Sequence, residues 1–269
     1  MTRLQEVVLT IDLSIFKPNA AVSRRTWWVI GILEAFVLAL IWQVSATGML
    51  PGPGEVFGAF PDLWSNGFGQ EMATSFKLCL EALMITTVIS LVLAYATVLP
   101  VMQPIVEALS RGRFLGLVGL SFIFTLLASG GHELKLMMLT FGMSVFFLTS
   151  MLSVVKSIPK ADFDYARTLR MSEWEIVWQV IIRGRLSMAI DMLQQNFAIG
   201  WTMLTTVEGI SRGEGGIGKM LLDSNKHFDL ASIFAIQISI FVVGLTLDYL
   251  IGILNRALCS YAFLNLERR

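Results

Sequence analysis

The chain has 269 residues, of which 55% are hydrophobic and only 15% charged, and its mean hydropathy is +0.70. Soluble domains have about 45–50% apolar and 25% charged residues, so this composition predicts a membrane protein. The formal net charge of zero argues against a nucleic-acid-binding protein.

The chain divides into a short polar tail and a long apolar domain. Residues 1–26 carry mixed charges and are predicted to be a cytoplasmic tail or an amphipathic helix on the inner leaflet. Residues 27–269 are predicted to be an all-α transmembrane domain with about six membrane-spanning helices. The predicted spans are residues 27–44, 76–98, 114–131, 136–155, 186–207 and 230–254.

The distribution of Lys and Arg supports this topology. With both termini in the cytoplasm, most basic residues fall on the cytoplasmic side, as the positive-inside rule requires. The basic residues predicted to lie outside are Lys77, Lys135, Arg212, Lys219 and Lys226.

Residues 157–185 form the long charged interval between two apolar segments, and the topology places them in the cytoplasm. Ser172 and Glu175 have the spacing of a capping box, in which each side chain binds the backbone N–H of the other residue. Pro159 suits the start of a preceding helix. The stretch is therefore predicted to be a helix–turn–helix at the membrane surface that presents a knob to another protein.

The run Asp164-Tyr165-Ala166-Arg167-Thr168-Leu169 resembles the EAA loop of the permease subunits of binding-protein-dependent ABC importers. The resemblance implies a type I importer permease fold and a coupling helix that docks on an ATPase. The implied coupling residues are Asp164, Tyr165, Ala166, Arg167, Leu169 and Arg170. Arg170 occupies the position of the family's turn glycine, and Arg183 that of a later proline. Because a non-glycine residue in a left-handed turn costs about 1 kcal/mol, either the turn is built differently or Arg170 has another role.

The run Leu50-Pro51-Gly52-Pro53-Gly54-Glu55-Val56 resembles a segment of the nitrate/sulfonate/taurine branch of this family. That branch implies a small organic or inorganic anion, such as a sulfonate, taurine or nitrate, as the solute. The implied partners are two copies of an ABC ATPase, which bind ATP and magnesium, a solute-binding protein, and a second permease subunit, identical or different. The implied location is a prokaryotic inner (plasma) membrane, crossed several times.

Polar residues are concentrated in the predicted span 186–207. Unsatisfied polar groups in hydrocarbon cost on the order of several kcal/mol each, so some of these residues must face a cavity or a partner helix. The residues predicted to line the substrate path are Gln194, Gln195, Asn196, Trp201 and Glu208. For each of them, hydrogen bonding between helices without a role in transport remains an equal alternative.

Two other functions remain open from the sequence. The chain could be an ion-coupled secondary transporter that uses Glu34, Glu81, Asp191 and Asp248, or a membrane assembly subunit that transports nothing. The sequence contains no G-x-x-x-x-G-K-[ST] loop and no Ser/His/Asp arrangement. We therefore predict no catalytic residue, metal site or cofactor in this chain, and assign ATP hydrolysis to a partner ATPase.

Overall fold

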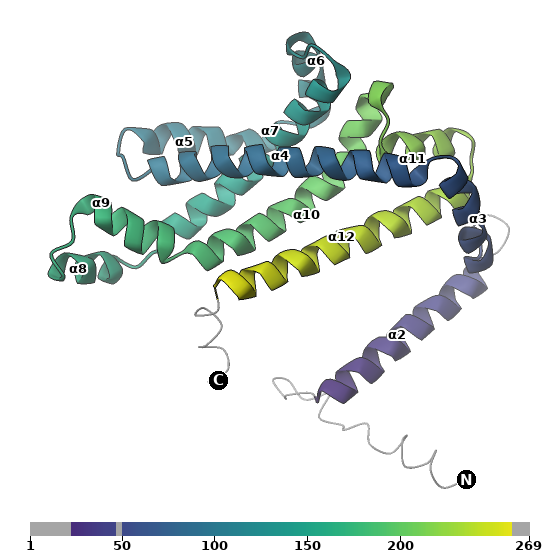
Figure 1. The fold of residues 1–269 in the computed structure, drawn as a ribbon, viewed down its shortest axis with the longest axis horizontal. Coiled ribbons are helices and arrows are strands. Elements are labelled where there is room, and N and C mark those ends of the chain that lie inside the picture. Colours follow the sequence, from purple (N-terminus) through teal and green to yellow (C-terminus); the bar gives the residue numbers. More distant parts are fainter. Residues whose placement is uncertain (1–22, 47–49, 260–269) are drawn as a thin grey trace, which may run out of the picture. The chain divides into compact units, whose positions relative to one another are not determined.

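The computed structural model describes residues 23–46 and 50–259, and all regular secondary structure in these ranges is helical (Figure 1). The main helices are α2 (Arg24–Ser45), α3 (Pro53–Ser65), α4 (Phe68–Ala96), α5 (Met102–Ser110), α6 (Leu117–Leu127), α7 (Gly131–Lys156), α8 (Lys160–Thr168), α9 (Glu173–Ile176), α10 (Leu186–Ile210), α11 (Ile217–Lys226) and α12 (Leu230–Leu258). The all-α fold class is confirmed for this part of the chain. Residues 1–22, which make up most of the predicted tail, lie outside the described residues.

The chain divides into two compact units, residues 1–59 and 60–269, which are described separately. In the first unit, the Ser23 hydroxyl caps α2 by accepting a hydrogen bond from the backbone N–H of Thr26 over 3.2 Å. The apolar side chains of α2 are exposed on all sides, as expected of a helix surrounded by lipid. The domain boundary expected after residue 26 falls near the start of α2 and remains a prediction.

In the second unit, α7 is the central helix, and both α4 and α10 pack along it. Close packing with α10 is possible because Gly200 leaves room for the side chain of Met143. A hydrogen bond links α7 to α4, where the Thr86 hydroxyl donates to the carbonyl of Thr140 over 3.3 Å. α12 packs against α10 on the other side. With α4 and α11 also in contact, α10 has four helical neighbours among the described residues, and part of its surface stays uncovered.

Four described helices are long and apolar enough to cross a membrane, namely α2, α4, α7 and α12. The uninterrupted span expected over residues 114–131 is not present. Instead, Met102–Phe114 and Leu117–Leu127 form a pair bent by 111°, which makes a fifth span if it is counted as one. With 11 residues, α6 extends only about 17 Å, too short for a hydrocarbon core of about 30 Å.

The span predicted over residues 186–207 corresponds to α10, which differs in composition from the other long helices. Its 25 residues extend about 37 Å, which is long enough to cross. Its polar side chains lower its mean hydropathy, so it is not among the four strongly apolar helices. The polar composition indicates that α10 has something other than lipid on part of its surface.

The two ends of α10 meet different structures. Residues 157–185, containing α8 and α9, connect the end of α7 to the start of α10, and α11 follows the other end of α10. Figure 1 shows α8 and α9 at one end of the unit and α11 at the opposite end. Whatever binds at α8 and α9 is therefore separated from α11 by the full length of α10.

Candidate functional site

Residues 157–185 fold into α8, a turn, α9, and a π-helix over Val177–Arg183 that continues from α9. The predicted capping box is present. The Ser172 hydroxyl accepts from the N–H of Glu175, and the Ser172 N–H donates to Glu175 Oε2 over 2.7 Å. The helix–turn–helix predicted from these residues is confirmed.

The capping box makes the stability of α9 dependent on pH. Hydrogen bonds from the backbone N–H and then the hydroxyl of Ser172 lower the pKa of Glu175 below its ordinary value of 4.5. Because the folded-state pKa is the lower one, this stabilisation is present above pH 4.5 and is lost as the pH falls through the folded-state pKa. We expect amide hydrogen exchange of residues 173–176, corrected for intrinsic rates, to accelerate over that acidic range. Glu175→Gln should remove the dependence, and an unchanged acid response in this variant would contradict the assignment.

The turn after α8 places Arg170 in the left-handed region, with φ of 59°. The N–H of Met171 donates to the carbonyl of Ala166 over 3.3 Å, and the N–H of Arg170 donates to that of Arg167 over 2.9 Å. These two bonds are those of a Schellman motif, which usually has glycine at the Arg170 position. The turn is thus built as it would be around a glycine, with an arginine in its place.

Replacing Arg170 by glycine should stabilise this stretch. We expect Arg170→Gly to raise the free energy of unfolding by about 1 kcal/mol, because the left-handed backbone is unstrained for glycine. The measurement is hydrogen exchange of residues 160–176 in the purified protein. The control is Thr168→Gly, at a helical position of α8, which should destabilise by about 0.5–1 kcal/mol. Equal effects of the two substitutions would contradict the strain argument.

Five of the six predicted coupling residues are exposed, and Ala166 is buried beneath them. Tyr165 is 68% exposed and Leu169 54%, which gives α8 an apolar surface with no covering element among the described residues. Arg167 bonds to Glu173 over 3.2 Å and lies 3.5 Å from Asp164. The hydrogen bond to Glu173 raises the pKa of Arg167, so the guanidinium stays charged. The surface combines apolar and charged groups, as protein-binding surfaces do.

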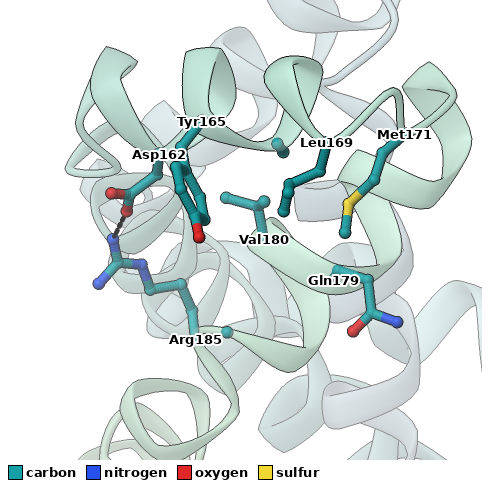
Figure 2. A pocket seen from close by; sticks show the side chains of 9 residues that line it. Asp162, Tyr165, Leu169, Met171, Gln179, Val180 and Arg185 are labelled. Atoms are coloured by element: carbon teal, nitrogen blue, oxygen red, sulfur yellow. Dashed lines mark hydrogen bonds and ion pairs between the residues drawn. The ribbon is translucent and has the colours of Figure 1, made fainter.

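A cavity of about 330 Å³ lies between α8 and the π-helix. Figure 2 shows Asp162, Tyr165 and Leu169 on one side and Gln179, Val180 and Arg185 on the other. Arg185 donates to Asp162 Oδ2 over 2.8 Å and so ties the start of α8 to the end of the π-helix. This ion pair makes the helix–turn–helix one closed unit.

The residues predicted to line the substrate path occupy different positions on α10. Gln194 donates to Asp248 Oδ1 of α12 over 2.9 Å, and Trp201 Nε1 donates to the carbonyl of Ile240 over 2.9 Å. Gln195 is exposed, whereas Asn196 is buried with neither end of its amide hydrogen-bonded. For Gln194 and Trp201, bonding between helices is thus the observed contact, and a role in the path remains a prediction.

One face of α10 is exposed along its whole length. The exposed residues follow each other at intervals of three or four: Met188, Asp191, Gln195, Ala198, Thr202 and Thr206. This spacing puts them on one side of the helix. Asp191 also accepts a bond from Asn255 of α12 over 2.5 Å. We call these six residues the polar face of α10.

At the other end of α10, Glu208 is buried, with 1% of its surface exposed. Its carboxylate accepts hydrogen bonds from the Ser75 hydroxyl over 2.5 Å and from the N–H of Gly218 over 2.8 Å. Ser75 Oγ in turn accepts from the N–H of Ile217 over 2.8 Å. Glu208, predicted to lie on the path, is observed in a network that holds the first turn of α11.

Two more charged side chains bind the backbone before α11. Glu71 of α4 accepts a hydrogen bond from the N–H of Gly216, and Lys135 of α7 donates to the carbonyl of Gly215 over 2.7 Å. Both glycines have positive φ, 74° and 108°, which side chains other than glycine adopt only with strain. Three helices, α4, α7 and α10, therefore fix residues 215–218 through side chains. We call Glu71, Ser75, Lys135 and Glu208 the α11 anchor.

Comparison with known proteins identifies the chain's relatives. The model of the family described as "Binding-protein-dependent transport system inner membrane component" matches residues 72–259. The chain belongs to this family. The match begins early in α4 and ends just after α12, so it includes the helix–turn–helix, the polar face of α10 and most of the α11 anchor.

The chain is also similar to a solved structure titled "Inward facing conformations of the MetNI methionine ABC transporter: CY5 SeMet soak crystal form". The two share 18% sequence identity, with 74% of this chain and 95% of that chain covered and a TM-score of 0.47. A search of curated proteins finds no match.

Three members of the α11 anchor, Glu71, Ser75 and Lys135, were not expected from the sequence. Each lies on a different helix from Glu208 and far from it along the chain, so no local spacing could pair them. Within residues 23–46 and 50–259, no cluster of three His, Cys, Asp or Glu side chains could hold a metal ion. That the chain needs no cofactor remains a prediction.

Proposed function

We propose that this chain forms half of the solute path of an ATP-driven importer and receives the movement of an ATPase through residues 157–185. The main support is the exposed surface of Tyr165 and Leu169 on a helix–turn–helix that is inserted directly between α7 and α10. Displacing this element moves the ends of two long helices together. Such a rigid-body shift is how ATP binding in a partner would change access to the path.

The polar face of α10 supports the second part of the proposal. A transmembrane helix with Asp191, Gln195, Thr202 and Thr206 exposed along one side needs water or protein there. A second permease subunit, identical or different, would cover this face and enclose the path with it. In this assembly two ATPases bind ATP and magnesium, both termini lie in the cytoplasm of a prokaryotic cell, and a solute-binding protein delivers solute near α11.

The solute class expected from the sequence resemblance is a small organic or inorganic anion, such as a sulfonate, taurine or nitrate. The family match is to the inner membrane component in general. The anion therefore remains a prediction.

Native mass spectrometry of the gently solubilised complex tests the proposed function. We expect two ATPases together with either two copies of this chain or one copy and a different permease. ATP hydrolysis by the reconstituted complex should rise when the solute-binding protein is added with its solute. A complex without any ATPase, from membranes in which the chain is abundant, would overturn the proposal and favour a secondary transporter or an assembly subunit.

A further inference from the structure

A cavity of about 340 Å³ lies between α10 and α12. Its walls are mainly apolar and aromatic, and the polar lining residues are few. Phe197, Trp201, Thr202, Phe241, Gly244 and Asp248 are among the residues that line it. The volume and the mixture of aromatic walls with a few polar groups are typical of sites for small organic molecules.

The aromatic wall of this cavity is held in place. Trp201 donates from Nε1 to the carbonyl of Ile240 over 2.9 Å and is 4% exposed. Its ring stacks on Phe197 with a centroid distance of 6.1 Å and an interplanar angle of 24°. Gly244 lets the indole approach α12, because a Cβ there would lie 3.0 Å from Trp201 Cδ1. The cavity therefore has a rigid flat wall before any ligand arrives.

Asp248 is the only ionisable side chain among the described residues that line the cavity. One carboxylate oxygen, Oδ1, accepts from Gln194 over 2.9 Å, which fixes the orientation of the group. A carboxylate within a membrane span is costly unless a charged or polar partner compensates it. The described lining contains a carboxylate and no Lys, Arg or His, so a positively charged ligand would complement its charge.

The cavity also adjoins the polar face of α10. Ala198 and Thr202 belong both to that face and to the cavity lining. Along α12 the lining runs from Gln237 to Asp248, about 16 Å of helix. Because α10 and α12 run in opposite directions, Asp248 lies at the end nearer to residues 157–185. An elongated solute would enter from the path with its charged end toward that side.

We propose that this cavity is a binding site on the path for a solute with an apolar, preferably aromatic, body and a positively charged nitrogen. The inference rests on the proposed function and makes its solute class specific. The body packs on Trp201 and Phe241, and the nitrogen donates to Asp248. This class differs from the simple anions expected from the sequence resemblance, although a zwitterion with an ammonium group satisfies both.

Three probes of similar shape and different charge test the proposal. They are 2-phenylethylammonium, 3-phenylpropanamide and 3-phenylpropionate, titrated by ligand-observed NMR into the permease–ATPase complex in nanodiscs. We expect the cation to bind most tightly and the anion least. Asp248→Asn keeps an acceptor for Gln194 but removes the charge, and should weaken the cation about tenfold, to the level of the amide. The matched control Asp223→Asn, on α11, should leave all three affinities unchanged.

A steric variant tests the location. Ala198→Phe should fill the cavity and abolish binding of all three probes. Equal or tighter binding of the anion, or no binding of any probe to a complex that retains its ATPase, would overturn the cation site while leaving the proposed function standing. If the cavity instead holds a lipid that Ala198→Phe displaces, and no probe binds, the proposed cation site is also overturned. If the chain never assembles with an ATPase, the proposed function is overturned instead. Binding of the cation can then still be measured on the chain alone, so the two proposals remain distinguishable.

Discussion

Substituting Glu208 by alanine should destabilise the protein by about 3–5 kcal/mol. The carboxylate is buried and accepts bonds from Ser75 and from the N–H of Gly218. Removing it leaves these buried donors unsatisfied and takes away one of the carboxylates that face Lys135, and losses of this kind cost about 3–5 kcal/mol. Unfolding by sodium dodecyl sulfate in bicelles, followed by circular dichroism, measures the change. Glu208→Gln, which keeps one acceptor oxygen, should lie between the wild type and Glu208→Ala.

The control for this prediction is Glu214→Ala. Glu214 lies in the loop before α11 but is exposed, so its substitution should change the free energy of unfolding by less than about 0.5 kcal/mol. If Glu208→Ala changed the free energy of unfolding as little as Glu214→Ala, the α11 anchor would not contribute to stability. The transport role predicted for Glu208 from the sequence would then become the better explanation of its burial.

The double substitution Tyr165→Ala/Leu169→Ala should separate the permease from its ATPase. Both side chains are exposed, Tyr165 on α8 and Leu169 at its C-cap, and would be buried by docking. Central apolar contacts of this kind contribute about 2 kcal/mol or more each. Two such losses weaken association by about 1,000-fold. We expect the ATPase to be lost on size-exclusion chromatography and solute uptake into proteoliposomes to cease, with the circular dichroism spectrum unchanged.

A matched control is Phe228→Ala, which removes an exposed aromatic side chain between α11 and α12, at the opposite end of α10. This variant should retain the ATPase. Association that survives the Tyr165/Leu169 change, or that is equally lost with Phe228→Ala, would rule out α8 as the docking surface. Arg167 is less informative, because its charge is already engaged by Glu173 and Asp164.

The sequence predicted well wherever the interacting residues are close along the chain. Ser172 and Glu175 are three residues apart, so their capping box and the start of α9 could be predicted from spacing alone. Long apolar runs likewise predicted α4, α7 and α12. The prediction of one helix over residues 114–131 was wrong, because Gly116 has an extended backbone that separates α6 from the preceding turn. A run of apolar residues does not reveal such a break.

Contacts between distant residues could not be predicted. The polar residues of α10 were expected to face a cavity or a partner helix, but the sequence could not tell which would bond to other helices of this chain. Gln194 hydrogen-bonds to Asp248, and Glu208 to Ser75, and the partners are more than 50 positions apart in each case. The separation of α10 into bonded residues and a polar face depends on where α7 and α12 pack, and this is fixed only by the tertiary structure.

The α11 anchor has a consequence for signalling across the membrane. Because α4, α7 and α10 all bind the backbone of residues 215–218, α11 cannot tilt without them. Residues 157–185 connect the end of α7 to the start of α10. In the proposed importer, a solute receptor resting on α11 would therefore sense whether the distant motor holds ATP. Linkage then requires the reverse as well: loading the receptor must change the motor's affinity for ATP by the same factor.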